Sequence, residues 1–383
     1  MKYLSILFIT ITFFLGINSC KTKSGSINNQ VKALLLSSEN FDTTVNNSHV
    51  KLFTLQNQGG IVVQLTNYGA TIVSVITPDK NGNYADITLG YKSIKDYFTD
   101  KMNLGCIVGP YANRISKGLF TIDGTKYQLE INNGVNTLHS GKNSFSKKVW
   151  TSKQNGNTVT MVYEAADLEA GFPGNIKVTA VYTLTPDNRL ELRISAETDK
   201  KTVINLTNHA YFNLSGEGSG SILGHQIQIL ADFITPVDST LIPTGEFMPV
   251  ENTPFDLRTQ VFIGDGIDKN ENQQIRYGNG YDHNWVLTNK TGKLAQAVRL
   301  ADPVSKRILE ISTNQPGMQL YTGNFMNGTV TGKSGKQYNY RNALALEPQF
   351  FPDSPNHDNF PSTILEPGKT YEHITVYSFG LME

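Results

Sequence analysis

Two side chains in this sequence have the chemistry of a proton donor and a proton acceptor. His209 lies in the run TNHAYFNLSG (207–216), among amides and aromatic rings, and Glu347 follows an apolar run that begins at Ala343. A histidine with an ordinary pKa of about 6.5 can hold or release a proton near neutrality, whereas a glutamate near 4.3 is ionised and can accept one. The two residues together predict general acid and base chemistry. Taken alone, His209 also fits a structural histidine that neighbouring amides satisfy.

Other polar side chains stand in turn-like stretches beside aromatic residues. Asn113 and Arg114 could hold vicinal hydroxyls, because the guanidinium is a fixed fork of donors, although Arg114 alone also fits a strand-end arginine paired with a surface carboxylate. The others are His139 in NTLHSG (136–141), Tyr211 two residues after His209, Asp282 in GYDHNW (280–285) and Gln319 in QPGMQLYTGN (315–324). Such a set, spread over most of the chain, predicts a polar cleft assembled from several strands.

The same residues count against several other reaction classes. No HExxH motif or cysteine pair indicates a metal site, and Asp282 and His283 would face opposite ways on a strand. No G-x-S-x-G motif supports a serine hydrolase. Cys106 lies in an apolar run without basic neighbours in sequence, which predicts an inert buried thiol. Two alternatives stay open: a glycosidase that uses Asp282 and Glu347 as its carboxylate pair, and a sugar-binding module without turnover.

Many short strands must position these residues. Turn pairs such as Asn81 and Gly82 recur between alternating or β-branched segments and predict an all-β fold. The expected strands are 71–77, 84–89, 118–122, 126–131, 158–163, 177–185, 189–197, 202–206, 284–287, 294–300 and 371–379. Short helices are expected at 93–97 and near 259–261, and 236–257 is expected to be a long surface loop over a cleft. Because no repeat or linker interrupts the chain from Lys51 onward, one large antiparallel domain is predicted.

The N-terminal segment is predicted to be a targeting signal rather than part of the folded domain. A positive Lys2 and an apolar run over 4–15, too short to span a bilayer, precede Ile17, Asn18, Ser19 and Cys20. This ending resembles the lipobox of bacterial lipoproteins, in which cleavage falls before a lipid-bearing cysteine. We therefore expect a signal peptide at 1–19, lipidated Cys20 with a flexible tether at 20–46, and the folded domain at 47–383, anchored in a bacterial cell envelope. Ordinary secretion with a free Cys20 is the alternative.

Charge and length restrict the class of partner. The 383 residues carry 33 basic and 33 acidic side chains, with a pI of about 7.1. No global field therefore directs the protein to nucleic acid, and a neutral small molecule suits this balance better than a phosphorylated one. The sequence does not decide between a monomer and a homodimer.

Six blocks in order carry a resemblance to a known family. They are NRI (113–115), NTLHSG (136–141), TNHAYFNLSG (207–216), GYDHNW (280–285), QPGMQLYTGN (315–324) and LEPQFFPDSPNH (346–357). From about Asn47 to the C-terminus the chain resembles aldose 1-epimerase, the galactose mutarotase family. The resemblance implies a single large antiparallel β-sandwich, with no required metal or cofactor, that interconverts the α and β anomers of free aldohexoses.

Roles follow from the resemblance position by position. It implies that Glu347 is the general base, His209 the general acid and His139 a second histidine near the ring oxygen. The residues expected to bind hydroxyls are Asn113, Arg114, His139, Tyr211, Asp282 and Gln319. The chain departs from the family pattern at Ser140, usually glycine, at Pro348, usually a small polar residue, and at Pro110, often arginine. Ser140 and Pro110 are expected to influence which sugar fits.

Overall fold

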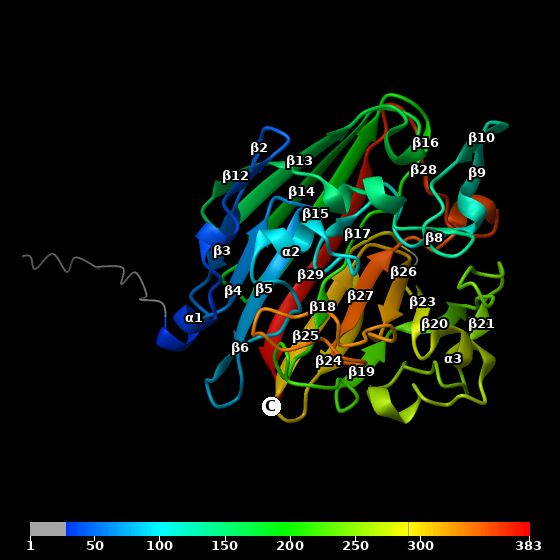
Figure 1. Ribbon diagram of the computed structural model, residues 1–383. Helices are drawn as coiled ribbons and strands as arrows, with labels where there is room; N and C mark the ends of the chain where they lie inside the picture. The colour runs from blue at the N-terminus through cyan, green and yellow to red at the C-terminus, as the bar shows by residue number, and fades with distance from the viewer. Residues whose placement is uncertain (1–27, 290) are drawn as a thin grey trace, which may run out of the picture.

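A nine-stranded antiparallel sheet forms one layer of the protein, in the residues that the computed structural model describes (28–289 and 291–383). Its order is β12 (Thr151–Asn155), β13 (Thr158–Ala165), β14 (Ile176–Leu184), β15 (Arg189–Thr198), β29 (Tyr371–Leu381), β25 (Arg307–Thr313), β24 (Ala295–Ala301), β19 (Gln226–Ile229) and β22 (Val261–Phe262). Every second residue of β14 is buried, so one face of the sheet covers the core. Figure 1 shows its long strands running diagonally across the molecule.

A six-stranded antiparallel sheet packs against this layer and carries much of the candidate site. Its order is β18 (Tyr211–Phe212), β27 (Leu344–Gln349), β26 (Gly317–Tyr321), β23 (Asp282–Leu287), β20 (Ala231–Thr235) and β21 (Met248–Pro249). All six residues of β27 are buried, which fits a central strand that is covered on both faces. Leu344 and Leu346 face the core shared with the nine-stranded sheet, whereas Ala345 belongs to a second apolar cluster with Tyr211.

A third sheet and five two-stranded pairs complete the strands. The four-stranded sheet is β3 (Leu52–Gln56), β4 (Val62–Thr66), β5 (Thr71–Pro78) and β6 (Tyr84–Asp86). The pairs are β1 (Thr43–Val45) with β2 (Ser48–Val50), β7 (Ile107–Val108) with β17 (Thr207–Asn208), β8 (Arg114–Ile115) with β11 (Thr137–Leu138), β9 (Leu119–Ile122) with β10 (Thr125–Gln128), and β16 (Thr202–Val203) with β28 (Ile364–Leu365). A bridge between Thr88 and Phe212 joins the end of the four-stranded sheet to β18. The expected antiparallel β-sandwich is confirmed.

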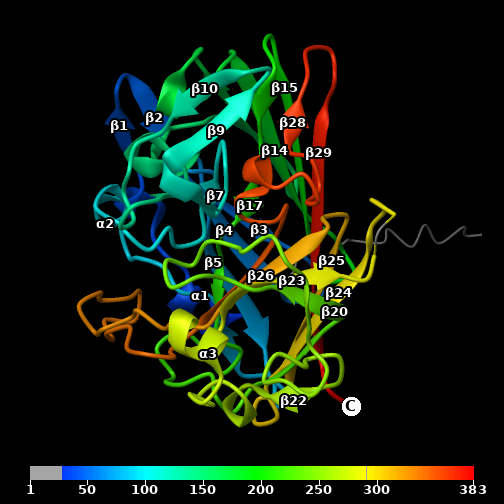
Figure 2. The same ribbon diagram turned by 90° about the vertical axis from the view of Figure 1, so that its right-hand side faces the viewer.

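The α-helices in the described residues are few and short. They are α1 (Asn29–Leu34), α2 (Ile94–Phe98) and α3 (Gln273–Gly278), and Figure 2 shows α2 and α3 at the margin of the sheets. Helix α2 matches the expected helix at 93–97. The helix expected near 259–261 is wrong, because Val261 and Phe262 form β22 and pair with Ile227 and Gln226. None of the helices in the described residues is long and apolar enough to cross a membrane.

The beginning of the described chain is more structured than expected. Residues 29–46, assigned above to a flexible tether, contain α1 and strand β1, which pairs with β2. Val31 of α1 is buried against Val62 and Ile76, so packing on the four-stranded sheet orders this stretch. The expected signal peptide and Cys20 lie outside the described residues.

Candidate active site

One cavity of about 1200 Å³ gathers nearly all the candidate residues. Those that line it are Asn113, Arg114, His139, His209, Tyr211, Asp282 and Glu347. Gln319 does not line the cavity, but its Nε2 donates to Oδ1 of Asp282 at 2.7 Å, so it contacts a residue of the cavity wall. The loop predicted at 236–257 also contributes, through Ser239, Thr240 and Leu241. The sequence therefore located a single site.

His209 reaches the cavity because its chain segment changes strand partners there. Thr207 and Asn208 pair with β7, whereas Tyr211 and Phe212 pair with β27. The strand expected over 202–206 is accordingly shorter than predicted, ending at Val203. Between the two pairings, the His209 amide donates to the Cys106 carbonyl at 2.9 Å. The crossover places the imidazole beside the strand that carries Glu347.

Glu347 occupies the cavity face of β27. Strand alternation puts it on the side opposite Leu346, and its cross-strand partner on β26 is Gln319. The hydroxyl of Thr207 donates to the Pro348 carbonyl at 2.8 Å, which ties the His209 segment to β27 one residue from the carboxylate. Glu347 Oε1 lies 3.5 Å from His209 Nε2. The expected acid and base are therefore direct neighbours.

Burial changes the protonation expected for this pair. Glu347 is 2% exposed and His209 is 4% exposed. Desolvation, with the charge of Asp282 as a smaller cause, holds the pKa of Glu347 well above its usual range, and desolvation lowers the pKa of His209 to about 4. Burial therefore disfavours the ionised glutamate and the partly protonated histidine that ordinary pKa values predict. The charge of Asp282 thus helps to keep Glu347 protonated.

His139 is held in one tautomer. Its Nδ1 accepts a hydrogen bond from the Asn113 amide at 3.1 Å, so the proton of the neutral ring is on Nε2. Burial, with the charges of His209 and Arg114 as smaller causes, holds the pKa of His139 well below its usual range. The rings of His139 and His209 lie 5.2 Å apart, edge to face. His139 is thus a neutral donor beside the proposed acid.

Three side chains of the site could serve as metal ligands, but a hydrogen bond to one of them disfavours metal binding. Within the described residues, ligand atoms of His139, His209 and Glu347 lie within 4.8 Å of one another. Ligation through His139 Nε2 would move the ring proton to Nδ1, where it would face the Asn113 amide proton. The donor set therefore fits a metal poorly.

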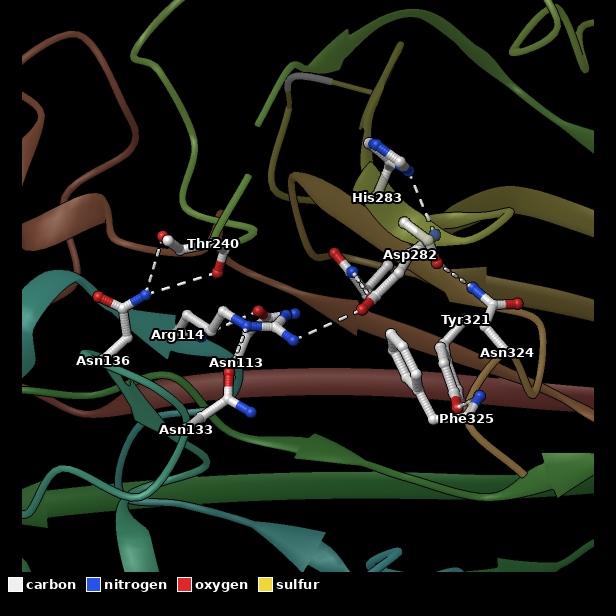
Figure 3. A network of polar contacts seen from close by, with 12 residues as sticks. Asn113, Arg114, Asn133, Asn136, Thr240, Asp282, His283, Tyr321, Asn324 and Phe325 are labelled. Carbon is white, nitrogen blue, oxygen red and sulfur yellow. Dashed lines mark hydrogen bonds and ion pairs between the residues drawn. The ribbon is translucent and has the colours of Figure 1, made fainter. Parts of the chain in front are cut away.

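Arg114 and Asp282 form a second buried polar pair in the cavity. The Arg114 Nη2 atom lies 3.6 Å from Asp282 Oδ2, and Arg114 Nε donates to Asn133 Oδ1 at 3.2 Å. Figure 3 shows the guanidinium pointing toward Asp282, with Asn133 on its other side. With both partners nearly buried, the alternative of a surface ion pair is excluded. Asp282 and His283 face opposite ways, since His283 packs on Phe255 at 4.8 Å.

Comparison with known proteins decides the family. A family model described as aldose 1-epimerase matches residues 51–378. The chain belongs to the aldose 1-epimerase family. Among curated relatives, galactose mutarotase of Sus scrofa is 41% identical over 332 residues, which cover 87% of this chain and 94% of that protein. Aldose 1-epimerase of Escherichia coli K12 is 38% identical over 332 residues, which cover 86% of this chain and 95% of that protein.

Solved structures of this family share the fold. An aldose epimerase homologue from C. elegans superposes with a TM-score of 0.81 at 32% identity, covering 87% of this chain and 100% of that one. Galactose 1-epimerase from Lactobacillus acidophilus superposes with a TM-score of 0.78 at 28% identity, covering 89% of this chain and 97% of that one. The predicted family, fold and enzyme class, an aldose 1-epimerase, are confirmed.

The departures from the aldose 1-epimerase pattern lie outside the cavity wall. Ser140 adopts a left-handed backbone with φ of 63°, which explains why glycine is usual there, and its hydroxyl bonds to the backbone of Tyr111. Neither Ser140 nor Pro110 lines the cavity. The expected influence of these two residues on which sugar fits stays a prediction, and it would have to act through neighbouring residues that do line the cavity.

The sequence missed one wall of the cavity. Phe325, Met326, Val330 and Tyr338, all in the connection between β26 and β27, line it. The aromatic residues that flank the turn-forming KSGK tetrapeptide (333–336) were the available signal. Cys106 behaves as predicted: it is 3% exposed, and burial raises the pKa of its thiol to about 12 despite the nearby charge of Lys147.

Proposed function

We propose that this protein interconverts the α and β anomers of free hexoses such as glucose and galactose, with Glu347 as general base and His209 as general acid. The observation that supports it most is the 3.5 Å contact between the two buried side chains in the wall of the cavity. The base takes the proton of the C1 hydroxyl while the acid gives a proton to the ring oxygen, and the bond between C1 and the ring oxygen breaks. The aldehyde then rotates by half a turn and the ring closes from either face.

The pair holds the right number of protons for this cycle. Ring opening converts ionised Glu347 and protonated His209 into neutral Glu347 and neutral His209, and ring closure reverses the transfer. Both arrangements contain one proton, so no exchange with water is needed during turnover. Burial favours the neutral arrangement, which is the form that follows ring opening.

The remaining cavity residues have binding roles in this proposal. Arg114 and Asp282 present charged donors and acceptors to sugar hydroxyls, and Tyr211, 5.0 Å from the His209 ring, packs beside the acid. His139 offers its Nε2 proton to the ring oxygen or a neighbouring hydroxyl. Asp282 is already engaged by Gln319 and Arg114, which suits a binding role better than the acid of a glycosidase.

Polarimetry on the wild type tests the function. Fresh α-glucose and α-galactose should reach anomeric equilibrium faster with enzyme than in buffer alone, and an oligosaccharide should release no new reducing ends. A glycosidase would release them. A binding module without turnover would bind the sugars, as isothermal calorimetry would show, and leave the optical rotation to change at the buffer rate.

We also propose that the protein is a bacterial lipoprotein, anchored to a cell-envelope membrane through Cys20. Support comes from the sequence alone: the positive start, the apolar run 4–15 and the small polar residues before the cysteine. Full-length protein expressed in bacteria with labelled palmitate should carry the label and sediment with membranes. The Cys20→Ser variant should lose both properties; an unlabelled wild type would contradict the proposal.

A further inference from the structure

The connection between β26 and β27, residues 322–343, is the cavity wall that family motifs do not explain. Its outer part folds back on itself: the Tyr338 amide donates to the Val330 carbonyl at 2.8 Å, and the Gly332 amide donates to the Lys336 carbonyl at 2.7 Å. We call residues 328–338 the cleft hairpin. Figure 1 shows this connection, in orange, reaching from β26 and β27 toward β5 and β6, and Figure 2 shows it projecting on the side that carries α2.

The tip of the cleft hairpin sends a charged side chain into the neighbouring sheet. Lys333 Nζ lies 2.5 Å from Asp86 Oδ2 and donates to the Val73 carbonyl at 2.7 Å. The Lys333 and Asp86 side chains are only 6% and 8% exposed. The methylenes of Lys333 pass beside Gly90. A side chain at Gly90 has no room, because an added Cβ would lie 2.8 Å from the Val73 carbonyl oxygen. The site is therefore shaped for this one side chain.

Hydrogen bonds from neighbouring residues stabilise the buried Asp86 carboxylate beside the Lys333 ammonium group. Oδ2 also accepts from the Ser74 hydroxyl at 2.5 Å, and Oδ1 accepts from the amides of Val75 and Thr88. Burying two charges is costly and is compensated only when their hydrogen bonds are satisfied, as they are here. A lysine in a polar surface hairpin would ordinarily extend into water, so its burial fixes where the hairpin can lie.

The cleft hairpin acts on the active site through packing. Val330, Thr331 and Tyr338 line the cavity, and Tyr338 and Val330 pack in the cluster that contains Tyr211. The Tyr338 hydroxyl donates to the Gly90 carbonyl at 2.7 Å, which fixes the base of the hairpin beside the same glycine that the Lys333 side chain passes. Displacing the tip would therefore move one wall of the sugar-binding cavity.

We infer that Lys333 and Asp86 are positioning residues that hold the cleft hairpin as a wall of the cavity and thereby set the affinity for sugar. The inference rests on the proposed function for its kinetic readout. Neither residue touches the reacting atoms, so losing the pair should raise KM and leave kcat nearly unchanged.

Two variants and a matched control test this inference. Lys333→Met should raise KM for galactose by roughly three- to ten-fold with kcat within about two-fold of wild type. The double variant Lys333→Met with Asp86→Asn leaves no unpaired buried charge, so it should fold even if the single variant does not, and it should show the same change. Lys336→Met, three residues along the same hairpin and exposed, should match the wild type. A folded double variant with wild-type KM would overturn the inference.

Hydrogen exchange separates this inference from the proposed function. In both Lys333 variants the amides of Gly332 and Tyr338 should exchange faster than in the wild type, whereas amides of the central strand β27 should not. Unchanged exchange at these amides would overturn the anchoring role. Wild-type protein without any rate enhancement would overturn the proposed function alone, and the exchange result would still decide whether the ion pair positions the hairpin.

Discussion

His209 Nε2 lies 3.5 Å from Glu347 Oε1, and both side chains are almost completely removed from water. In this setting an acid and a base titrate together, because a proton on one buried side chain changes the free energy of placing a charge on the other, 3.5 Å away. Catalysis by these two residues requires that the pair hold one proton.

The pH dependence of kcat/KM should show where the pair of His209 and Glu347 gains a second proton and where it loses its only one. The one-proton pair gains a second proton only below the lowered pKa of His209, about 4, and loses its proton only above the raised pKa of Glu347. We expect activity to fall around pH 4 and to stay level through neutrality. Initial rates by polarimetry in buffers of constant ionic strength, corrected for the buffer reaction, measure the profile. An alkaline loss centred on pH 6.5 would instead indicate an unperturbed histidine.

Removing both members of the pair should cost little more than removing one. Glu347→Gln with His209→Asn should be slowed about as much as the slower single variant, since either change already leaves the transfer incomplete. Polarimetric rates of the four proteins give the comparison. Multiplicative losses would show that the two groups act independently.

Arg114→Lys should weaken sugar binding while keeping the charge. Lysine cannot reproduce the fork that contacts Asn133 on one side and Asp282 on the other. Loss of a hydrogen bond to a charged group is worth about 1.5–3 kcal/mol, so KM should rise roughly 10- to 100-fold. Steady-state kinetics with galactose check this. A variant with unchanged KM would exclude Arg114 from the binding site.

Much of this arrangement was predictable, because local patterns determine it. The turn at Pro186–Asn188 fixed the hairpin of β14 and β15 to within a residue at each boundary. The candidate site residues could be proposed because six blocks keep their order, and the fold brings most of them to one cavity. Strand β22 was mistaken for a helix because two residues are too few for periodicity, and its pairing with β19 comes from tertiary contacts.

The protonation of the site was not predictable from sequence. His209 and Glu347 are 138 residues apart, and only the fold shows that both side chains are almost completely buried. The cleft hairpin was missed for a similar reason. Lys333 looks like any surface lysine until its partner, Asp86, is brought beside it by the packing of two sheets.

Buried histidines should make the protein less stable in acid. Burial lowers the pKa of His373, outside the cavity, to about 3, so between about pH 6.5 and 3 the unfolded state binds a proton that the folded state does not. The free energy of unfolding should therefore fall as pH falls through this range, with His373 contributing up to about 1.4 kcal/mol per pH unit. Urea denaturation of wild type and His373→Gln at several pH values measures both slopes. Equal slopes would contradict this assignment.

The central claim is most directly tested by the anomerisation rate of Glu347→Gln, with His209→Asn beside it. Each variant should lose nearly all activity, roughly 10²- to 10⁴-fold, because each lacks one of the two proton transfers. Polarimetry on fresh α-galactose gives the rate, and circular dichroism confirms that each variant is folded. A folded variant whose rate stays within a few-fold of the wild type would remove that residue from its role and contradict the claim.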